Sequence, residues 1–434
     1  MFVLILAYLV LTIIRPQDYM AALHGIPCLQ VVLVLAFLSW LGSSAKTMAA
    51  PQFLLLPAFL CALLMSEVAN SWMGGAFDQL AQFGPTVIAF FVLATAVSSS
   101  RQRVVITFAV FALGAMVLAL HGVDQFNHGV GWTGMTLSED RRIRYVGIFN
   151  DPNDLGLLLV AALPMTVYLS ARGGFLGKLF WLAGAALLLY GIYLTNSRGA
   201  FLAVMVIAGI YLWRTRGLLV SLILSGVGML GMLMLPARVQ DLDVDDPSAF
   251  GRVDAWYEGL QMFRSHPLFG VGAGNFTDYN YLTAHNSLVL VLAETGFFGY
   301  VLWLAFVGYS LMMTVRLLQR RIKPDEPGKS IAPRGKKTSD ASLDTDWDRE
   351  RGIALTLMLS LCGTFATMFF LSRSYTIVIY LLIAVVVGDF VGVRRRFPEI
   401  QEFSLLKNGW IWIPIALGSI VFLFLVVAVL LHSA

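Results

Sequence analysis

Two arginines and a histidine in the second half of the chain have side chains suited to phosphate chemistry and proton transfer. Arg198 lies in TNSRGAF, Arg252 in GRVDAW and His285 in TAHNSLVLVLAETG. Arginine forks hold phosphate oxygens through paired hydrogen bonds, and histidine exchanges protons near neutral pH. Together they predict a cationic pocket that binds a phosphate-bearing substrate, with His285 as the catalytic residue and Asn286 beside it as a further substrate contact.

Several other polar residues are candidates for the same pocket. Arg144 and Asn153 lie in RYVGIFNDPNDLG, and we expect both to contact substrate. The run from Asp151 to Asp154 also has the composition of a helix cap, which is the favoured interpretation of that turn. Three carboxylates are reserve candidates for the general base: Asp254, Glu258 and Glu294.

The stretch around Arg252 predicts an amphipathic helix. Its apolar residues recur at helical spacing, which predicts that they pack the helix onto the rest of the protein: Val253, Trp256, Tyr257, Leu260 and Phe263. We expect Arg252 to lie near the start of this helix, where a cation is disfavoured unless an anion binds beside it. A salt bridge to Asp254 or Glu258 is the alternative explanation.

We expect neither a metal nor a cofactor. The acidic run Asp241–Asp246 fails the calcium-loop pattern, because Asp246 replaces the required Gly and Arg252 replaces the closing Glu. The glycines of HPLFGVGAGNF, residues 266–276, have no surrounding strand–helix unit and no following GK[ST], so they predict a tight turn rather than a nucleotide loop. The three Cys are far apart, which favours packing roles.

The composition shows which elements must position these residues. Of 434 residues, 58% are hydrophobic and 13% charged, which excludes a soluble globular protein. The net charge of +4 gives no reason to expect nucleic acid as a partner. We predict an all-α polytopic membrane protein with about 12–13 transmembrane helices and a large helical external loop. Thirteen apolar segments carry this prediction: 1–14, 26–42, 53–69, 80–98, 104–121, 153–171, 177–195, 199–213, 217–235, 296–318, 352–371, 374–392 and 408–431.

Charge in the short loops predicts the orientation of these segments. Positive residues concentrate on the cytoplasmic side of membrane proteins. An inside N-terminus satisfies this rule at nearly every cluster: Lys46, Arg101, Arg103, Arg172, Lys178, Arg214, Arg216, the stretch 316–337 and Arg394–Arg396. It leaves the loops 122–152 and 236–286 outside, and an odd number of spans would leave the C-terminus outside too.

The chain is predicted to divide into three parts within one membrane domain. Residues 1–235 hold spans one to nine, 236–286 form the large external loop, and 287–434 hold the remaining spans. Pro, Gly, Ser and Lys in 320–351 predict a flexible cytoplasmic linker.

The external segments resemble the bacterial O-antigen ligase and polymerase superfamily. GIFNDPNDLG, NSRGAFLA, GRVDAW, HPLFGVGAGNF and AHNSLVLVLAETGFFGYVLWL occur in that family's order. The resemblance implies a metal-independent, inverting glycosyltransferase of the bacterial inner membrane, active on the periplasmic side. It also implies transfer of a glycan from undecaprenyl pyrophosphate to a hydroxyl of lipid A-core, a polysaccharide or a protein. By motif, Arg198 and Arg252 correspond to the pyrophosphate-binding arginines and His285 to the essential histidine.

Two alternatives stay open. An O-antigen or exopolysaccharide polymerase would use the same donor, and IIRPQDYM near the N-terminus is similar to the exopolysaccharide and exosortase-linked branch, which puts lipopolysaccharide in doubt as the acceptor. The alternative from another class is a small-solute transporter, for example of bicarbonate. The concentration of charge in the external loop, rather than within the spans, disfavours transport.

Overall fold

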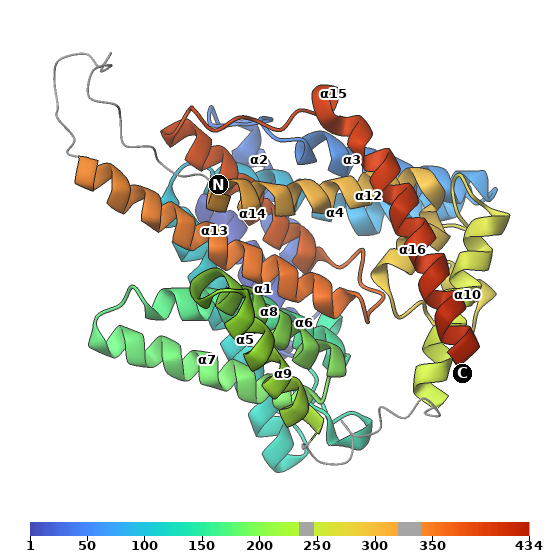
Figure 1. The fold of residues 1–434 in the computed structure, drawn as a ribbon, viewed down its shortest axis with the longest axis horizontal. Coiled ribbons are helices and arrows are strands. Elements are labelled where there is room, and N and C mark those ends of the chain that lie inside the picture. The colour runs from blue at the N-terminus through green and yellow to red at the C-terminus, as the bar shows by residue number, and fades with distance from the viewer. Residues whose placement is uncertain (234–246, 320–339, 434) are drawn as a thin grey trace.

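The computed structural model describes residues 1–233, 247–319 and 340–433, and the regular secondary structure in these ranges is helical (Figure 1). The helices are α1 Phe2–Ile14, α2 Cys28–Leu41, α3 Gln52–Ala69, α4 Met73–Val97, α5 Arg101–His128, α6 Pro152–Ser170, α7 Phe175–Thr195, α8 Arg198–Arg216, α9 Leu218–Leu233, α10 Pro247–Ser265, α11 Phe276–Tyr279, α12 Ser287–Gln319, α13 Asp340–Met368, α14 Ile377–Arg396, α15 Leu405–Asn408 and α16 Trp412–Ser433. Short 3-10 turns occur at η1 Pro16–Asp18, η2 Ala21–Leu23, η3 Glu139–Arg141, η4 Gly147–Phe149 and η5 Gly409–Ile411.

Each of the thirteen apolar segments coincides with one of these helices, and the all-α polytopic fold is confirmed. Within the described ranges, ten helices are long and apolar enough to cross a membrane. The helices α1 and α2 are apolar but have only 13 and 14 residues. At 1.5 Å per residue each extends about 20 Å, which is short of the roughly 30 Å hydrocarbon layer.

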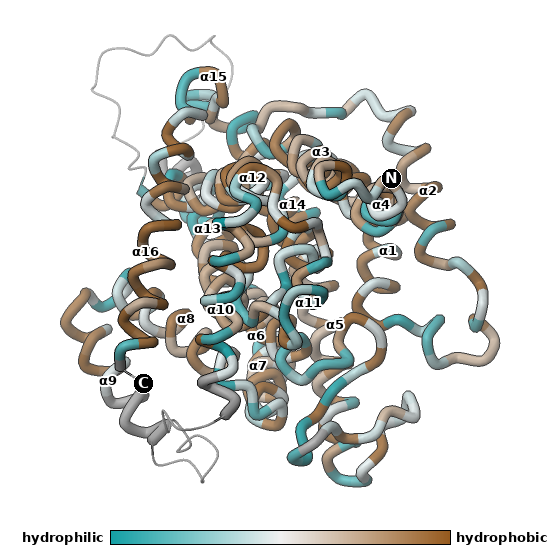
Figure 2. The backbone as a smooth tube through the Cα atoms, turned by 90° about the vertical axis from the view of Figure 1, so that its right-hand side faces the viewer, coloured by the Kyte–Doolittle hydropathy of each residue, from teal (hydrophilic) through white to brown (hydrophobic). Residues whose placement is uncertain are grey.

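Burial separates central helices from peripheral ones. The apolar windows of α14 and α6 are 89% and 83% buried, whereas those of α8 and α16 are 17% and 22% buried. Figure 2 shows α16 as a predominantly hydrophobic helix at the edge of the bundle. An apolar helix with little protein cover is the pattern expected for a lipid-facing span. The central α6 and α14 therefore provide the rigid support of the bundle.

The basic helix ends meet at one end of the bundle, where they surround a buried acid. Glu350 of α13, only 1% exposed, forms ion pairs with Arg101 at 3.4 Å and with Arg396 at 3.1 Å. Trp347 packs edge-on against Phe397. The prediction of a flexible linker over 320–351 is therefore wrong for residues 346–351, because these contacts hold them in the first turns of α13. Residues 320–339 lie outside the described part.

A glycine-rich turn and a break in α12 build the opposite end. Gly270 has φ +72°, and a Cβ there would lie 2.3 Å from the backbone of Glu294, so only glycine fits. Gly296 interrupts α12 with non-helical backbone angles. The two segments pair through backbone hydrogen bonds, including Gly272 N–H to the Glu294 carbonyl at 3.2 Å. The predicted tight turn is confirmed, and it docks the loop after α10 onto the bent α12.

Candidate functional site

Five helix ends meet at the end of the bundle opposite the basic cluster. The Arg142 guanidinium donates from Nε to the carbonyl of Thr195, at the end of α7, at 2.8 Å. The Ser287 hydroxyl, at the start of α12, donates to the Leu371 carbonyl at 2.6 Å, just after α13. Arg373, in the turn between α13 and α14, pairs with Asp154 of α6. These contacts join the loop before α6 to the segments that carry the predicted site.

Arg198 is the first residue of α8, and the residues beside it fix its position. Asn196 ends α7 in the left-handed conformation, with φ 49°. The buried Ser197 is the N-cap of α8 and accepts a hydrogen bond from the Ala200 N–H at 3.4 Å. Gly199 lies against the turn after α13, since a Cβ there would meet the Phe370 Cβ at 3.4 Å. The half-buried Arg198 therefore lies next to the turn that carries Arg373.

His285 lies directly before α12 in an uncommon backbone conformation. Its φ is 46°, a left-handed value that a non-glycine residue adopts at a local cost. The side chain is half-buried. Burial lowers the pKa of His285, and the nearby Arg252 guanidinium lowers it further. The imidazole is therefore neutral at neutral pH, which suits a general base better than a phosphate-binding cation.

Asn286 caps α12, so its carbonyl oxygen is not available to a substrate. That oxygen, Oδ1, accepts hydrogen bonds from the N–H groups of Leu288 at 2.8 Å and Val289 at 3.1 Å. Its Nδ2 is buried and has no hydrogen-bond partner among the described residues. Only the amide N–H groups remain for the predicted substrate contact. The cap also fixes the backbone of its neighbour, His285.

Arg252 lies deeper in its helix than the sequence predicts. α10 begins at Pro247, a residue suited to the first turn, so Arg252 occupies the second turn. The argument from free N–H groups at a helix start is therefore wrong for this arginine. The charge of Arg252 nevertheless acts on His285. The candidate bases Asp254 and Glu258 lie on the same helix and are partly exposed.

The apolar face of α10 is partly as predicted, since Val253 and Phe263 are half-buried and two of the five residues are fully buried. Trp256 is 7% exposed and packs edge-on against Phe369, and Leu260 is 1% exposed. Tyr257 was expected in the same stripe but is 39% exposed, while Met262 is buried instead.

Glu294 is 2% exposed and lies behind the glycine turn. Its Oε1 accepts the Phe276 N–H at 3.3 Å. The Ser66 hydroxyl donates to its backbone carbonyl. The side chain is buried behind the loop and one of its oxygens is held by the loop backbone, which makes Glu294 a poor candidate for a base that must reach the acceptor.

Arg144 and Asn153 have partners within the loop before α6. The Arg144 guanidinium donates from Nε to the Thr136 carbonyl at 3.0 Å and from Nη1 to Asn150 Oδ1 at 3.4 Å. Asn153 accepts from Arg142 at 3.0 Å and donates to Asp151 at 2.9 Å. Asp151 caps α6, as predicted, by accepting the Asn153 N–H at 2.7 Å. A direct substrate contact for Asn153 would require this network to open.

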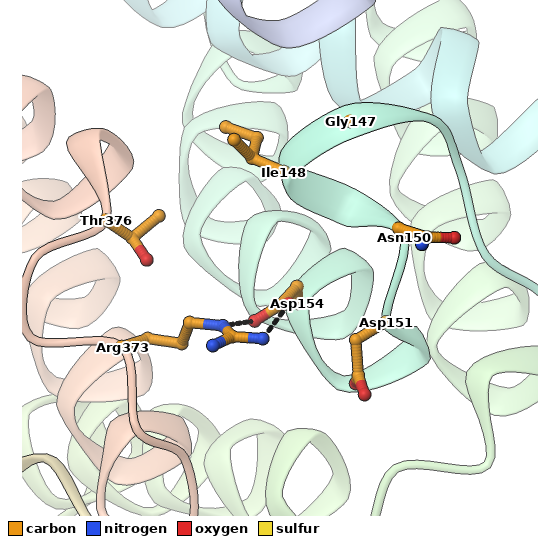
Figure 3. Close-up of a pocket in the computed structure, with 7 residues that line it drawn as sticks. All are labelled: Gly147, Ile148, Asn150, Asp151, Asp154, Arg373 and Thr376. Carbon is orange, nitrogen blue, oxygen red and sulfur yellow. Dashed lines mark hydrogen bonds and ion pairs between the residues drawn. The ribbon is translucent and has the colours of Figure 1, made fainter. Parts of the chain in front are cut away.

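Arg373 is a site residue that the sequence analysis missed. Its guanidinium forms a two-pronged ion pair with the 7%-exposed Asp154, through Nε to Oδ1 and Nη2 to Oδ2, the second at 2.7 Å (Figure 3). It follows the eleventh apolar segment, 352–371, on the predicted outer side. It therefore breaks the positive-inside rule just as Arg198 does, and that signal was available in the sequence.

Two polar cavities open beside this ion pair. The Arg373 cavity has a volume of about 440 Å³ and is lined by Gly147, Ile148, Asn150, Asp151, Asp154, Arg373 and Thr376 (Figure 3). The Arg142 cavity has a volume of about 520 Å³ and is lined by Leu137, Ser138, Asp140, Arg142, Arg144, Asn150, Asp151 and Pro152. They share Asn150 and Asp151, so they are adjacent.

No group of three or more His, Cys, Asp or Glu side chains in the described ranges is placed to hold a metal ion. The acidic run Asp241–Asp246 lies outside those ranges, so a metal there is untested by the structure.

The fold defines a multi-pass helical membrane protein with polar cavities among its helix ends. Residues 183–304 match the family model described as O-antigen ligase. This match confirms the resemblance to the O-antigen ligase-like superfamily and supports a function of the O-antigen ligase or polymerase type. The matched range contains Arg198, Arg252 and His285, whereas Arg373 lies beyond it. A comparison with curated proteins found no match.

Proposed function

We propose that the protein is a membrane glycosyltransferase that moves a glycan from undecaprenyl pyrophosphate to an acceptor hydroxyl at the periplasmic face of the bacterial inner membrane. One observation carries the proposal. Arg198, Arg252 and His285 all fall inside the O-antigen ligase match, and the charge of Arg252 acts on His285. The acceptor is a hydroxyl of lipid A-core, of a polysaccharide or of a protein.

The chemistry follows from the charges of the site. The bond between the anomeric carbon and the diphosphate oxygen breaks, and the diphosphate leaves with the bonding electron pair. Arg198 and Arg252 stabilise the negative charge that develops on this leaving group. The acceptor oxygen attacks the anomeric carbon from the opposite face, which inverts its configuration. The acceptor proton passes to the neutral His285 imidazole.

Charge on the diphosphate already makes it a good leaving group, so the mechanism we propose needs no metal. The lowered pKa of His285 supports the role of base, because a neutral ring can accept a proton at physiological pH.

The test is a transfer assay with purified protein, a polyprenyl pyrophosphate-linked glycan and the three acceptor classes. His285→Ala and Arg252→Ala are expected to abolish transfer while the protein still folds. His128→Ala and Arg264→Ala are the matched controls, since His128 is an exposed histidine at the end of α5 and Arg264 an exposed arginine on α10. Full activity of both site variants would refute the assignment. The product formed, a capped acceptor or an extended polymer, distinguishes ligase from polymerase.

A further inference from the structure

We propose that the Arg373 cavity and the adjoining Arg142 cavity bind the acceptor as a neutral, polyhydroxylated sugar, while the donor diphosphate binds at Arg198 and Arg252. This inference rests on the proposed function and assigns a separate subsite for the second substrate. It is carried by the lining of the cavities, their charge balance and their connection to the segment that bears His285.

The lining of the Arg373 cavity matches the hydrogen-bonding needs of sugar hydroxyls. Asn150 and Asp151 are exposed on one side, and Thr376 and Arg373 lie across from them (Figure 3). Thr376 is the N-cap of α14, but its hydroxyl accepts no hydrogen bond from that fully described helix. Amide, carboxylate and hydroxyl groups together offer donors and acceptors to vicinal hydroxyls. A volume of about 440 Å³ is within the range of small-molecule sites.

The charge balance disfavours a phosphate in the Arg373 cavity. Its charged lining is Asp151, Asp154 and Arg373, two negative groups and one positive, which leaves one net negative charge. Both carboxylate oxygens of Asp154 already accept hydrogen bonds from the Arg373 guanidinium. A guanidinium held in this way is neutralised by its own partner. The diphosphate is therefore expected at the other arginines, and a neutral ligand is expected here.

The Arg142 cavity extends the subsite by a second polar chamber. Its charged lining is Asp140, Asp151, Arg142 and Arg144, two negative and two positive, so its net charge is zero. Because the two chambers share Asn150 and Asp151, they lie side by side, and we propose that one acceptor chain spans both. Their volumes allow more than one sugar ring of an acceptor chain.

The cavity wall is tied directly to the segment that carries His285. The Arg373 N–H donates to the Ser287 hydroxyl at 3.1 Å, and the Ser374 hydroxyl donates to the Ser287 carbonyl at 2.8 Å. Ser287 is two residues after His285. The charges of Asp151 and Arg373 also act on the imidazole and shift its pKa. The Arg373 cavity is therefore linked to the segment of the proposed base through Ser287 and through the charges of its lining.

The N-terminal segment that contains Arg15 packs against the loop that lines the Arg373 cavity. Gly147 has φ +64°, and a Cβ there would lie 1.9 Å from Nε of Arg15. The Tyr145 hydroxyl donates to the Ile14 carbonyl at 2.8 Å. Arg15 itself pairs with Asp18 at 2.5 Å. The RPQDY stretch thus sets the shape of the loop that lines the subsite.

Saturation-transfer NMR on the full chain in lipid nanodiscs tests the subsite without requiring turnover. The probe is methyl β-D-glucopyranoside, and inorganic pyrophosphate is the competitor. The variant is the double substitution Thr376→Val with Asn150→Leu, and Thr376→Val alone is a second, milder variant. Ser404→Ala is the matched control, since Ser404 is also an N-cap without a side-chain capping bond and lines a polar cavity of about 400 Å³.

We expect saturation transfer to the glucoside in wild type and in Ser404→Ala, and its loss in the double variant. Excess pyrophosphate should leave the signal unchanged. In transfer kinetics the acceptor KM should rise about tenfold in the double variant, as for one or two lost hydrogen bonds, with the donor KM unchanged.

Three results would overturn the subsite. They are an absence of glucoside signal in wild type, equal signals in wild type and both cavity variants, and displacement of the glucoside by pyrophosphate. If the glucoside binds in a Thr376-dependent way but wild type transfers glycan to no acceptor, the cavity stands as a saccharide site and the proposed function fails.

Discussion

The Arg373–Asp154 ion pair makes a sharp prediction about stability, because its two partners are unequally buried. The Asp154 side chain is 7% exposed and that of Arg373 is 37% exposed. Arg373→Gln leaves a carboxylate buried without its partner, whereas Asp154→Asn leaves a guanidinium that water can reach. The two single variants should therefore differ in free energy of unfolding, although they remove the same pair.

The expected magnitudes follow from this difference. Removing one partner of a buried pair costs about 3–5 kcal/mol, and we expect that loss for Arg373→Gln. More than a third of Arg373 is exposed, so solvent screens its charge, and Asp154→Asn should cost about 1 kcal/mol. The double variant should lose less than the sum, with a coupling energy of about 2 kcal/mol.

The assay measures unfolding in mixed micelles of detergent and sodium dodecyl sulfate, and the loss of the helical circular dichroism signal monitors it. Arg264→Gln is the control, an exposed arginine whose loss should change stability by less than about 0.5 kcal/mol. Losses that add up without coupling, or a larger loss for Asp154→Asn than for Arg373→Gln, would refute the reasoning.

Four further predictions concern the site and its framework. If His285 acts as a neutral base, kcat/KM should hold at pH values somewhat below 6.5 and fall as the pH drops through the lowered pKa of His285. Arg252→Lys keeps the positive charge that helps to lower the pKa of His285, so the acid limb of the pH–rate profile of this variant should stay near the wild-type position. A shift of that limb to higher pH would contradict the inference that the charge of residue 252 lowers the pKa of His285. Gly270→Ala should lower the free energy of unfolding by about 1–3 kcal/mol or more, because the φ of Gly270 is +72° and the added Cβ would meet the backbone of Glu294. Gly418→Ala in α16 adds a Cβ into open space and should leave stability unchanged. Equal melting curves for the two variants would contradict this explanation of the turn. Transfer should survive chelation, and a loss of activity that a divalent ion restores would instead indicate a metal at residues 241–246.

The membrane helices could be predicted from sequence because each depends on local composition. Every apolar segment became a helix, and the cap at Asp151 was visible as a local pattern. The linker prediction failed at residues 346–351, because the buried contacts of Trp347 and Glu350 are with residues far along the chain. Local polarity alone could not reveal those partners.

The same limit applies to the candidate site. The charge of Arg252 lowers the pKa of His285. The predicted place of Arg252 near the helix start was wrong, because the sequence did not indicate that α10 begins at Pro247. Asn153 and Asn286 were expected to contact substrate, but the structure gives them hydrogen bonds within the protein. An asparagine near a helix start suits either role, and sequence does not distinguish them. Arg373 was missed although its outer position was visible, because its partner is 219 residues away.

That separation of 219 residues has a consequence for biosynthesis. At about 5–20 residues per second, a ribosome needs roughly 11–44 s to go from Asp154 to Arg373. During this interval the first turn of α6 carries an acid without its final partner, so we expect it to remain in contact with water at the membrane surface. The ion pair between Asp154 and Arg373 can therefore form only after most of the chain has been inserted into the membrane. A nascent chain, or one truncated before Arg373, would therefore lack the Arg373 wall of the cavity beside α6.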